Sequence, residues 1–96
     1  MIKHIVMWTL KEDNKEENAK EMVKRLNELK NKIDVIVSIE AGENITDSDR
    51  NYDIALVSEF KTVADLDQYR VHEDHQKVVQ FVRSVTDNVV AVDFEF

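Results

Sequence analysis

The chain has 96 residues, 43% of them hydrophobic and 34% charged, and its 20 acidic and 13 basic residues give a net charge of −7. This length and composition are typical of one globular domain. An acidic surface repels nucleic acid and anionic membranes, so we expect neither as a partner. The sequence has no cysteine, which excludes disulfides, thiol catalysis and thiolate metal sites.

The N-terminal residues lack the cationic lead, apolar stretch and cleavage site of a signal peptide. No apolar run reaches the roughly 20 residues that a membrane helix needs. We therefore expect a single domain over residues 1–96, located in the cytoplasm.

The first half of the chain predicts a strand, a helix and a strand. Ile2 to Leu10 is rich in Ile, Val, Trp and Thr and poor in turn residues, as strands are. From Lys15 to about Lys32, apolar residues recur every three or four positions, which indicates an amphipathic helix capped by Asp13 or Asn14. Ile33 to Glu43 contains a β-branched run and predicts a second strand.

The second half repeats this order. Tyr52 to Phe60 alternates in the manner of a strand, and Thr62 is a natural N-cap for the helix that follows. Apolar residues at helical spacing continue to Val85. Asp87 and Asn88 then predict a turn, and Val89 to Phe96 alternates as a fourth strand.

The order βαββαβ with right-handed crossovers predicts an α+β, ferredoxin-like fold: a four-stranded antiparallel sheet with two helices on one face. The other face would then be uncovered, although it carries Ile5, Met7, Ala55 and Val57. A second copy of the chain is the simplest cover for such an apolar surface. The pattern therefore predicts a homodimer packed sheet to sheet.

The residues best suited to proton transfer near neutral pH gather between Leu66 and His75. They are Tyr69, His72 and His75, and the remaining histidine, His4, lies in the first strand. If the protein has a reactive site, His4 and this segment should meet there. The alternative for Tyr69, His75 and His4 is a place in the core or at its rim. The alternative for His72 is a structural role, in which the ring forms a hydrogen bond near a helix kink.

Neither a metal nor another cofactor is expected. His72 and His75 are three residues apart, and the two acidic residues between them point away from the histidine face of a helix. The zinc-protease spacing of histidines at i and i+4 is absent. A single glycine, Gly42, leaves no glycine-rich phosphate loop.

Several motifs resemble the stress-responsive A/B barrel (Dabb) domain family, a group within the dimeric α/β barrels. They are the opening Ile2-Lys3-His4-Ile5-Val6, the segment Asp65-Leu66-Asp67-Gln68-Tyr69, the pair His72-x-x-His75 and the closing Val92-Asp93-Phe94. The resemblance covers essentially the whole chain and implies a dimeric barrel. The family usually has proline where this chain has Asp34 and Glu73, which predicts a softer kink after His72.

The resemblance also implies a site, because the family includes a plant polyketide cyclase whose cavity lies between helices and sheet. Its acid–base pair matches Tyr69 and His75, and its two other histidines match His4 and His72. A pocket tyrosine of that enzyme is replaced here by Leu26, which argues against the same substrate. Together with the shared strand face of His4 and Trp8, this predicts one cavity. Its substrate-binding residues would be His4, Trp8, Leu26 and His72.

Three functions fit these observations. The first is a stress-response protein that binds a small apolar or aromatic molecule without chemistry. The second is a cofactor-free polyketide cyclase-like or isomerase-like enzyme, in which His75 removes a proton next to a carbonyl and Tyr69 hydrogen-bonds the enolate. The third is a monooxygenase or haem-handling member of the wider dimeric barrel group.

Overall fold

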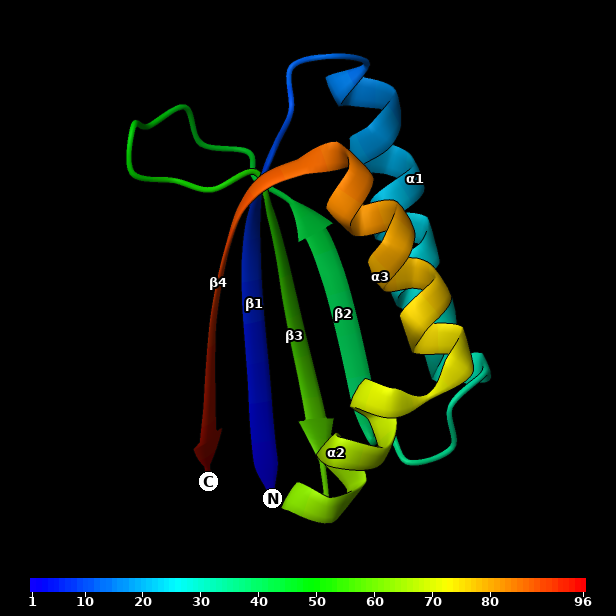
Figure 1. Ribbon diagram of the computed structural model, residues 1–96. Helices are drawn as coiled ribbons and strands as arrows, with labels where there is room; N and C mark the ends of the chain where they lie inside the picture. The colour runs from blue at the N-terminus through cyan, green and yellow to red at the C-terminus, as the bar shows by residue number, and fades with distance from the viewer.

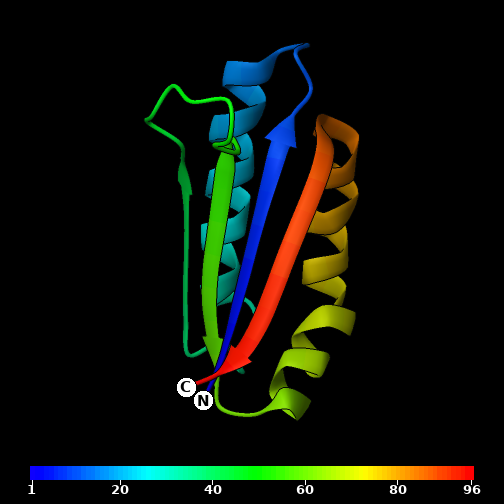
Figure 2. The ribbon, with the colours of Figure 1, turned by 90° about the vertical axis from the view of Figure 1, so that its left-hand side faces the viewer.

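The computed structural model describes all residues from 1 to 96. The elements in chain order are β1 (Ile2–Leu10), α1 (Lys15–Glu28) with a short 3-10 turn (Leu29–Asn31), β2 (Ser38–Glu43), β3 (Ile54–Phe60), α2 (Val63–Val71), α3 (Glu73–Val85) and β4 (Thr86–Glu95). The strands form one antiparallel sheet in the order β2-β3-β1-β4, and the helices lie on one side of it (Figures 1 and 2). This confirms the ferredoxin-like fold.

The centre of the sheet positions the functional residues. β1 pairs with β3 on one side and with β4 on the other, so that His4 lies opposite both Ser58 and Asp93. Because side chains alternate along a strand, His4 and Trp8 share the face that points toward the helices. Val6 and Trp8 on this face are buried in the main hydrophobic cluster.

The opposite face of the sheet has no helix over it (Figure 2). It leaves large apolar side chains exposed, among them Met7 at 39%, Val57 at 38% and Val92 at 53%. A patch of this kind on one face of a sheet is unusual for a monomer.

No helix of the chain is both long and apolar enough to cross a bilayer.

The second strand is shorter than predicted, because β2 begins at Ser38 and not at Ile33. Ile33 and Ile36 lie in the connection after α1, and they are 1% and 2% exposed. Both side chains are apolar because they pack into the core from a loop. A short apolar run in a buried loop has the same sequence pattern as a buried strand, so periodicity alone cannot distinguish the two. The third strand likewise begins at Ile54, two residues later than expected.

The predicted turn at Asp87 and Asn88 is wrong. α3 ends at Val85 and β4 starts at the next residue, Thr86. The backbone N–H of Asn88 donates to the Thr9 hydroxyl at 3.1 Å, next to a register shift in the β1–β4 pairing. Both polar residues therefore belong to the edge strand.

The first helix differs in detail at both of its ends. Asn14 occupies the N-cap position with a φ of 52°, a left-handed conformation that asparagine tolerates, but its side chain forms no cap bond. Regular α-helix stops at Glu28, and the 3-10 turn extends it to Asn31. Thr62 caps α2 as predicted, because its hydroxyl accepts from the backbone N–H of Asp65 at 3.1 Å.

The second helix is divided into α2 and α3 at His72, which has extended backbone angles of −63° and 137°. The softer kink predicted from Glu73 is therefore wrong. A proline is not needed, because the His72 ring caps α3 and the acidic Glu73 and Asp74 favour a helix N-terminus. The break turns α2 away from the axis of α3 (Figure 1).

Candidate functional site

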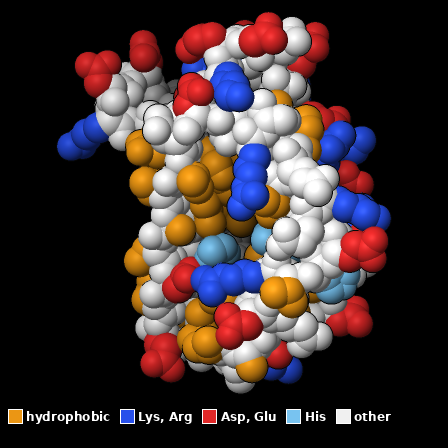
Figure 3. All heavy atoms as spheres, viewed as in Figure 1, with side chains coloured by type: hydrophobic (Ala, Val, Ile, Leu, Met, Phe, Trp, Pro, Cys, Tyr) orange, Lys and Arg blue, Asp and Glu red, His pale blue; other side chains and the backbone are white.

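A cavity of about 220 Å³ lies between the helix-facing side of β1 and β4 and the inner side of α3. Nine of its thirteen lining residues are hydrophobic. The lining consists of His4, Val6, Trp8, Leu26, Leu56, Tyr69, His75, Val78, Val79, Val82, Arg83, Thr86 and Val89. In the space-filling view this face is hollowed, with a hydrophobic floor, histidine side chains at the lower rim and basic side chains nearby (Figure 3).

Five of the six site residues proposed from the sequence meet in this cavity: His4 and Trp8 from β1, Leu26 from α1, Tyr69 from α2 and His75 from α3. The break at His72 makes this possible, since it lets Tyr69 and His75 approach from two helices. Their ring centroids are 4.2 Å apart, and Tyr69 lies 6.2 Å from the ring of His4.

His72 lies elsewhere. Its Nδ1 accepts a hydrogen bond from the backbone N–H of Asp74 at 3.1 Å, and it does not line the cavity. The expectation that His72 contacts a ligand is therefore dropped in favour of the structural alternative. The physical reason is that the first N–H groups of a helix need acceptors, and this ring supplies one for α3.

Burial and one hydrogen bond favour a neutral His75 ring with a particular tautomer. Its Nδ1 lies 3.1 Å from the carbonyl oxygen of Arg70, and since a carbonyl can only accept, Nδ1 carries the hydrogen. Burial lowers the pKa of His75 below its ordinary value, and the hydrogen bond to Arg70 opposes this in part. A neutral ring with Nδ1 protonated leaves the lone pair on Nε2 available to accept a proton.

Tyr69 is 1% exposed, and its hydroxyl is the single buried side-chain polar atom without a hydrogen-bond partner. Burial raises the pKa of Tyr69 above its ordinary value, so the phenol stays protonated at neutral pH. A buried hydroxyl normally has a partner, because leaving it unpaired costs about 1–3 kcal/mol. Tyr69 therefore has a hydrogen bond to offer beside His75.

The polar rim near His4 is a chain of hydrogen-bonded side chains. His4 Nδ1 donates to one carboxylate oxygen of Asp93, and Arg70 Nη2 donates to the other at 2.7 Å. Arg70 also lies 3.4 Å from Asp67. The chain joins β1, β4 and α2, and it holds the His4 ring at the edge of the cavity.

Arg83 and Thr86 also line the cavity, and neither was among the residues predicted for the site. Arg83 lies in the last turn of α3, inside the predicted helix, and Thr86 is the first residue of β4, just before the predicted turn. Arg83 follows His75 by eight residues, a little over two helical turns, and this spacing was the available signal.

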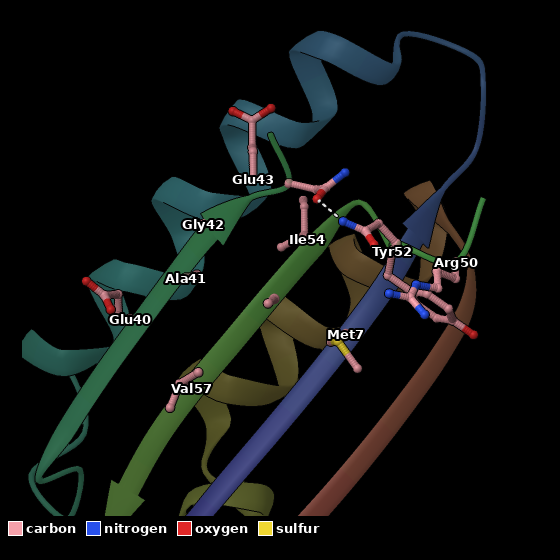
Figure 4. Close-up of a pocket in the computed structure, with 12 residues that line it drawn as sticks. Met7, Glu40, Ala41, Gly42, Glu43, Arg50, Tyr52, Ile54 and Val57 are labelled. Atoms are coloured by element: carbon pink, nitrogen blue, oxygen red, sulfur yellow. Dashed lines mark hydrogen bonds between the residues drawn. The ribbon is translucent and has the colours of Figure 1, made fainter. Parts of the chain in front are cut away.

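A larger hollow of about 630 Å³ lies on the uncovered face of the sheet (Figure 4). Met7 and Val57 point into it from the strands, and Arg50 and Tyr52 flank it from the loop before β3. It holds no histidine and coincides with the exposed apolar patch. We therefore take the smaller cavity as the candidate site. No group of three or more potential metal-ligating side chains is present.

Comparison with known proteins agrees with the fold. Residues 2–96 match the sequence family described as Stress responsive A/B Barrel Domain. The stress-response A/B barrel domain-containing protein DABB1 of Arabidopsis thaliana is 29% identical over 98 residues, which cover 98% of this chain and 46% of that protein. The chain thus spans about half the length of this relative.

Two solved structures superpose over almost the whole chain. A dimeric protein of unknown function and ferredoxin-like fold from Bacteroides fragilis has a TM-score of 0.89 and 29% identity, with 99% of this chain and 95% of that chain covered. The hydroxynitrile lyase of Passiflora edulis has a TM-score of 0.85 and 15% identity, with 97% and 90% covered. At this lower identity the likeness concerns the fold alone.

Proposed function

We propose, from the premise that the chain belongs to the stress-responsive A/B barrel domain family, that it binds a small apolar or aromatic molecule in the cavity beside Tyr69 and His75. One observation carries this proposal: Tyr69 lines a largely hydrophobic cavity, and its hydroxyl is buried without a hydrogen-bond partner. A ligand oxygen, such as that of a carbonyl, would accept the missing hydrogen bond.

The volume limits the size of the ligand. Sites for drug-sized molecules measure about 300–1,000 Å³, whereas a cavity of about 150 Å³ can hold benzene. At about 220 Å³, this cavity suits a molecule with one ring. It gives no support to the alternative of haem binding, since haem is far larger than one ring.

A cofactor-free acid–base reaction is the second candidate, and the geometry of His75 favours it. With Nδ1–H held by the Arg70 carbonyl, Nε2 can take a proton from a carbon next to a ligand carbonyl. The electron pair left behind would move onto the carbonyl oxygen as an enolate. Tyr69 would donate to that oxygen, and the proton on Nε2 would return to carbon at the same or another position.

We also propose a homodimer packed through the uncovered sheet face. Met7, Val57 and Val92 supply an apolar surface there, and the similar protein from Bacteroides fragilis is described as dimeric. Burying this face would remove that exposed apolar surface from water.

Binding can be tested with acetophenone, a neutral aromatic ketone, by following the indole N–H signal of Trp8 in NMR spectra. Trp8 is the one tryptophan of the chain and lines the cavity, so the signal reports on this site. Val79→Phe should fill the cavity and abolish the shift. The matched Val71→Phe, at a position on α2 that is 76% exposed, should leave it unchanged. An unmoved Trp8 signal at saturating probe would overturn the binding proposal.

The acid–base candidate needs a separate measurement. In deuterium oxide, the bound ketone should exchange the hydrogens next to its carbonyl faster than in buffer. His75→Gln should return the exchange to the buffer rate, and Tyr69→Phe should slow it by roughly 10²-fold. Binding without accelerated exchange would leave a binding protein and remove the enzyme.

A further inference from the structure

We infer that the ligand of this cavity is an anion, a compact aromatic or branched carboxylic acid whose carboxylate pairs with Arg83. The inference rests on the proposed binding function and narrows the class of ligand. Arg83 lines the cavity, yet it is exposed to solvent, so it marks the mouth and not the floor.

The lining of the cavity carries positive charge and no negative charge. The chain contains 20 acidic residues, but none of them lines this cavity. Arg83 is the one lining residue with a permanent charge, and no carboxylate lies within ion-pair distance of it. By contrast, Arg25 pairs with Glu21, and Arg70 pairs with Asp93 and Asp67.

An exposed arginine in the last turn of a helix can be accounted for without a ligand, because a cation there interacts favourably with the helix dipole. What this explanation leaves out is the position of Arg83 on the wall of an apolar cavity. In a chain of net charge −7, an unpaired cation at that place is an available partner for an anion. A guanidinium can bind a carboxylate through two parallel hydrogen bonds.

The spacing along α3 sets the size of the ligand. Arg83 lies eight residues after His75, a rise of about 12 Å along the helix. Both side chains lean toward the N-terminus of the helix, so this rise is also about the separation of their functional groups along the axis. One aromatic ring with its carboxylate fills that length, once a van der Waals contact with His75 and a hydrogen bond to Arg83 are added at its two ends. The ring would lie against Val78 and Val82, with the carboxylate at the mouth.

The inference can be tested with benzoate and benzamide, which share a ring and a planar head group but differ in charge. Each is titrated into the protein at low salt while the Trp8 signal is followed. Benzoate should bind about tenfold more tightly than benzamide, the effect of one charged hydrogen-bonded pair at a partly exposed position. Arg83→Gln should remove this preference and leave benzamide binding within about twofold.

Lys77→Gln is the matched control. It removes one positive charge from the same helix at a side chain that is 68% exposed and does not line the cavity. It should leave the preference for benzoate intact, whereas a general effect of net charge would reduce it equally in both variants. Arg83→Lys should retain part of the preference, because charge remains without the paired hydrogen bonds.

The outcomes separate this inference from the proposed function. Equal binding of benzoate and benzamide to the wild type, or a preference that survives Arg83→Gln, would overturn the anionic ligand. The binding function would still stand on the acetophenone titration. If acetophenone, benzoate and benzamide all leave the Trp8 signal unmoved, both proposals fall.

Discussion

Replacing Tyr69 with phenylalanine is expected to stabilise the unliganded protein and to weaken its binding of a carbonyl ligand. The ring of Tyr69 packs 5.0 Å from Phe60 and 4.2 Å from His75, and phenylalanine would keep these contacts. The one group removed is a hydroxyl that is buried without a partner.

The magnitude follows from the cost of that hydroxyl. An unsatisfied buried polar group costs about 1–3 kcal/mol, and its removal at constant shape returns part of this. We expect the free energy of unfolding to rise by about 1 kcal/mol. For a domain of this length, such a gain corresponds to a Tm increase of about 4–8 °C. Bound acetophenone should lose one hydrogen bond, so its affinity should fall by no more than about tenfold.

The assay is thermal and urea unfolding of both proteins at one fixed concentration, with the oligomeric state checked by sedimentation. Tyr52→Phe is the control, because Tyr52 is partly exposed and its change should stay within about 0.5 kcal/mol. A loss of 1 kcal/mol or more in Tyr69→Phe would refute the reasoning. It would mean that the hydroxyl already has a partner in solution and is not reserved for a ligand.

Three further changes test separate parts of the structure. Met7→Lys should place a charge in the proposed interface, at a cost of several kcal/mol. In sedimentation experiments at micromolar concentration, this variant should therefore be a monomer. A wild type that already sediments as a monomer would contradict the proposed dimer. His75 resists protonation when folded, so stability should fall as pH drops below its ordinary pKa of 6.5, because the unfolded chain then binds more protons. His75→Gln should flatten urea-derived stability across that range, and an unchanged slope would contradict the lowered pKa. His72→Ala should cost about 1 kcal/mol through the lost cap, His72→Asn should restore most of it, and neither should change acetophenone affinity if His72 lies outside the cavity.

The sequence alone determined the element order and the faces of the sheet. Alternation in Ile2–Leu10 places His4 and Trp8 on one face and Met7 on the other, and the structure keeps that division. Strand faces are readable because the side-chain period of two is local. The sequence also predicted that five residues meet in one cavity: His4, Trp8, Leu26, Tyr69 and His75. Periodicity does not show which elements lie side by side, and the family motifs supplied that information.

Only the tertiary structure decided the features that depend on partners distant in the chain. Ile33 and Ile36 were predicted to lie in a strand, but they pack into the core from a loop. Apolar side chains are required at both positions because the positions are buried, whatever the secondary structure. His72 became a helix cap because the first N–H groups of α3 required an acceptor. Arg83 lines the cavity because α3 packs over the sheet, next to residues of β1 that are distant in the chain. The local sequence pattern determines which face of a strand or helix a side chain lies on. Three-dimensional packing determines which other elements that face contacts.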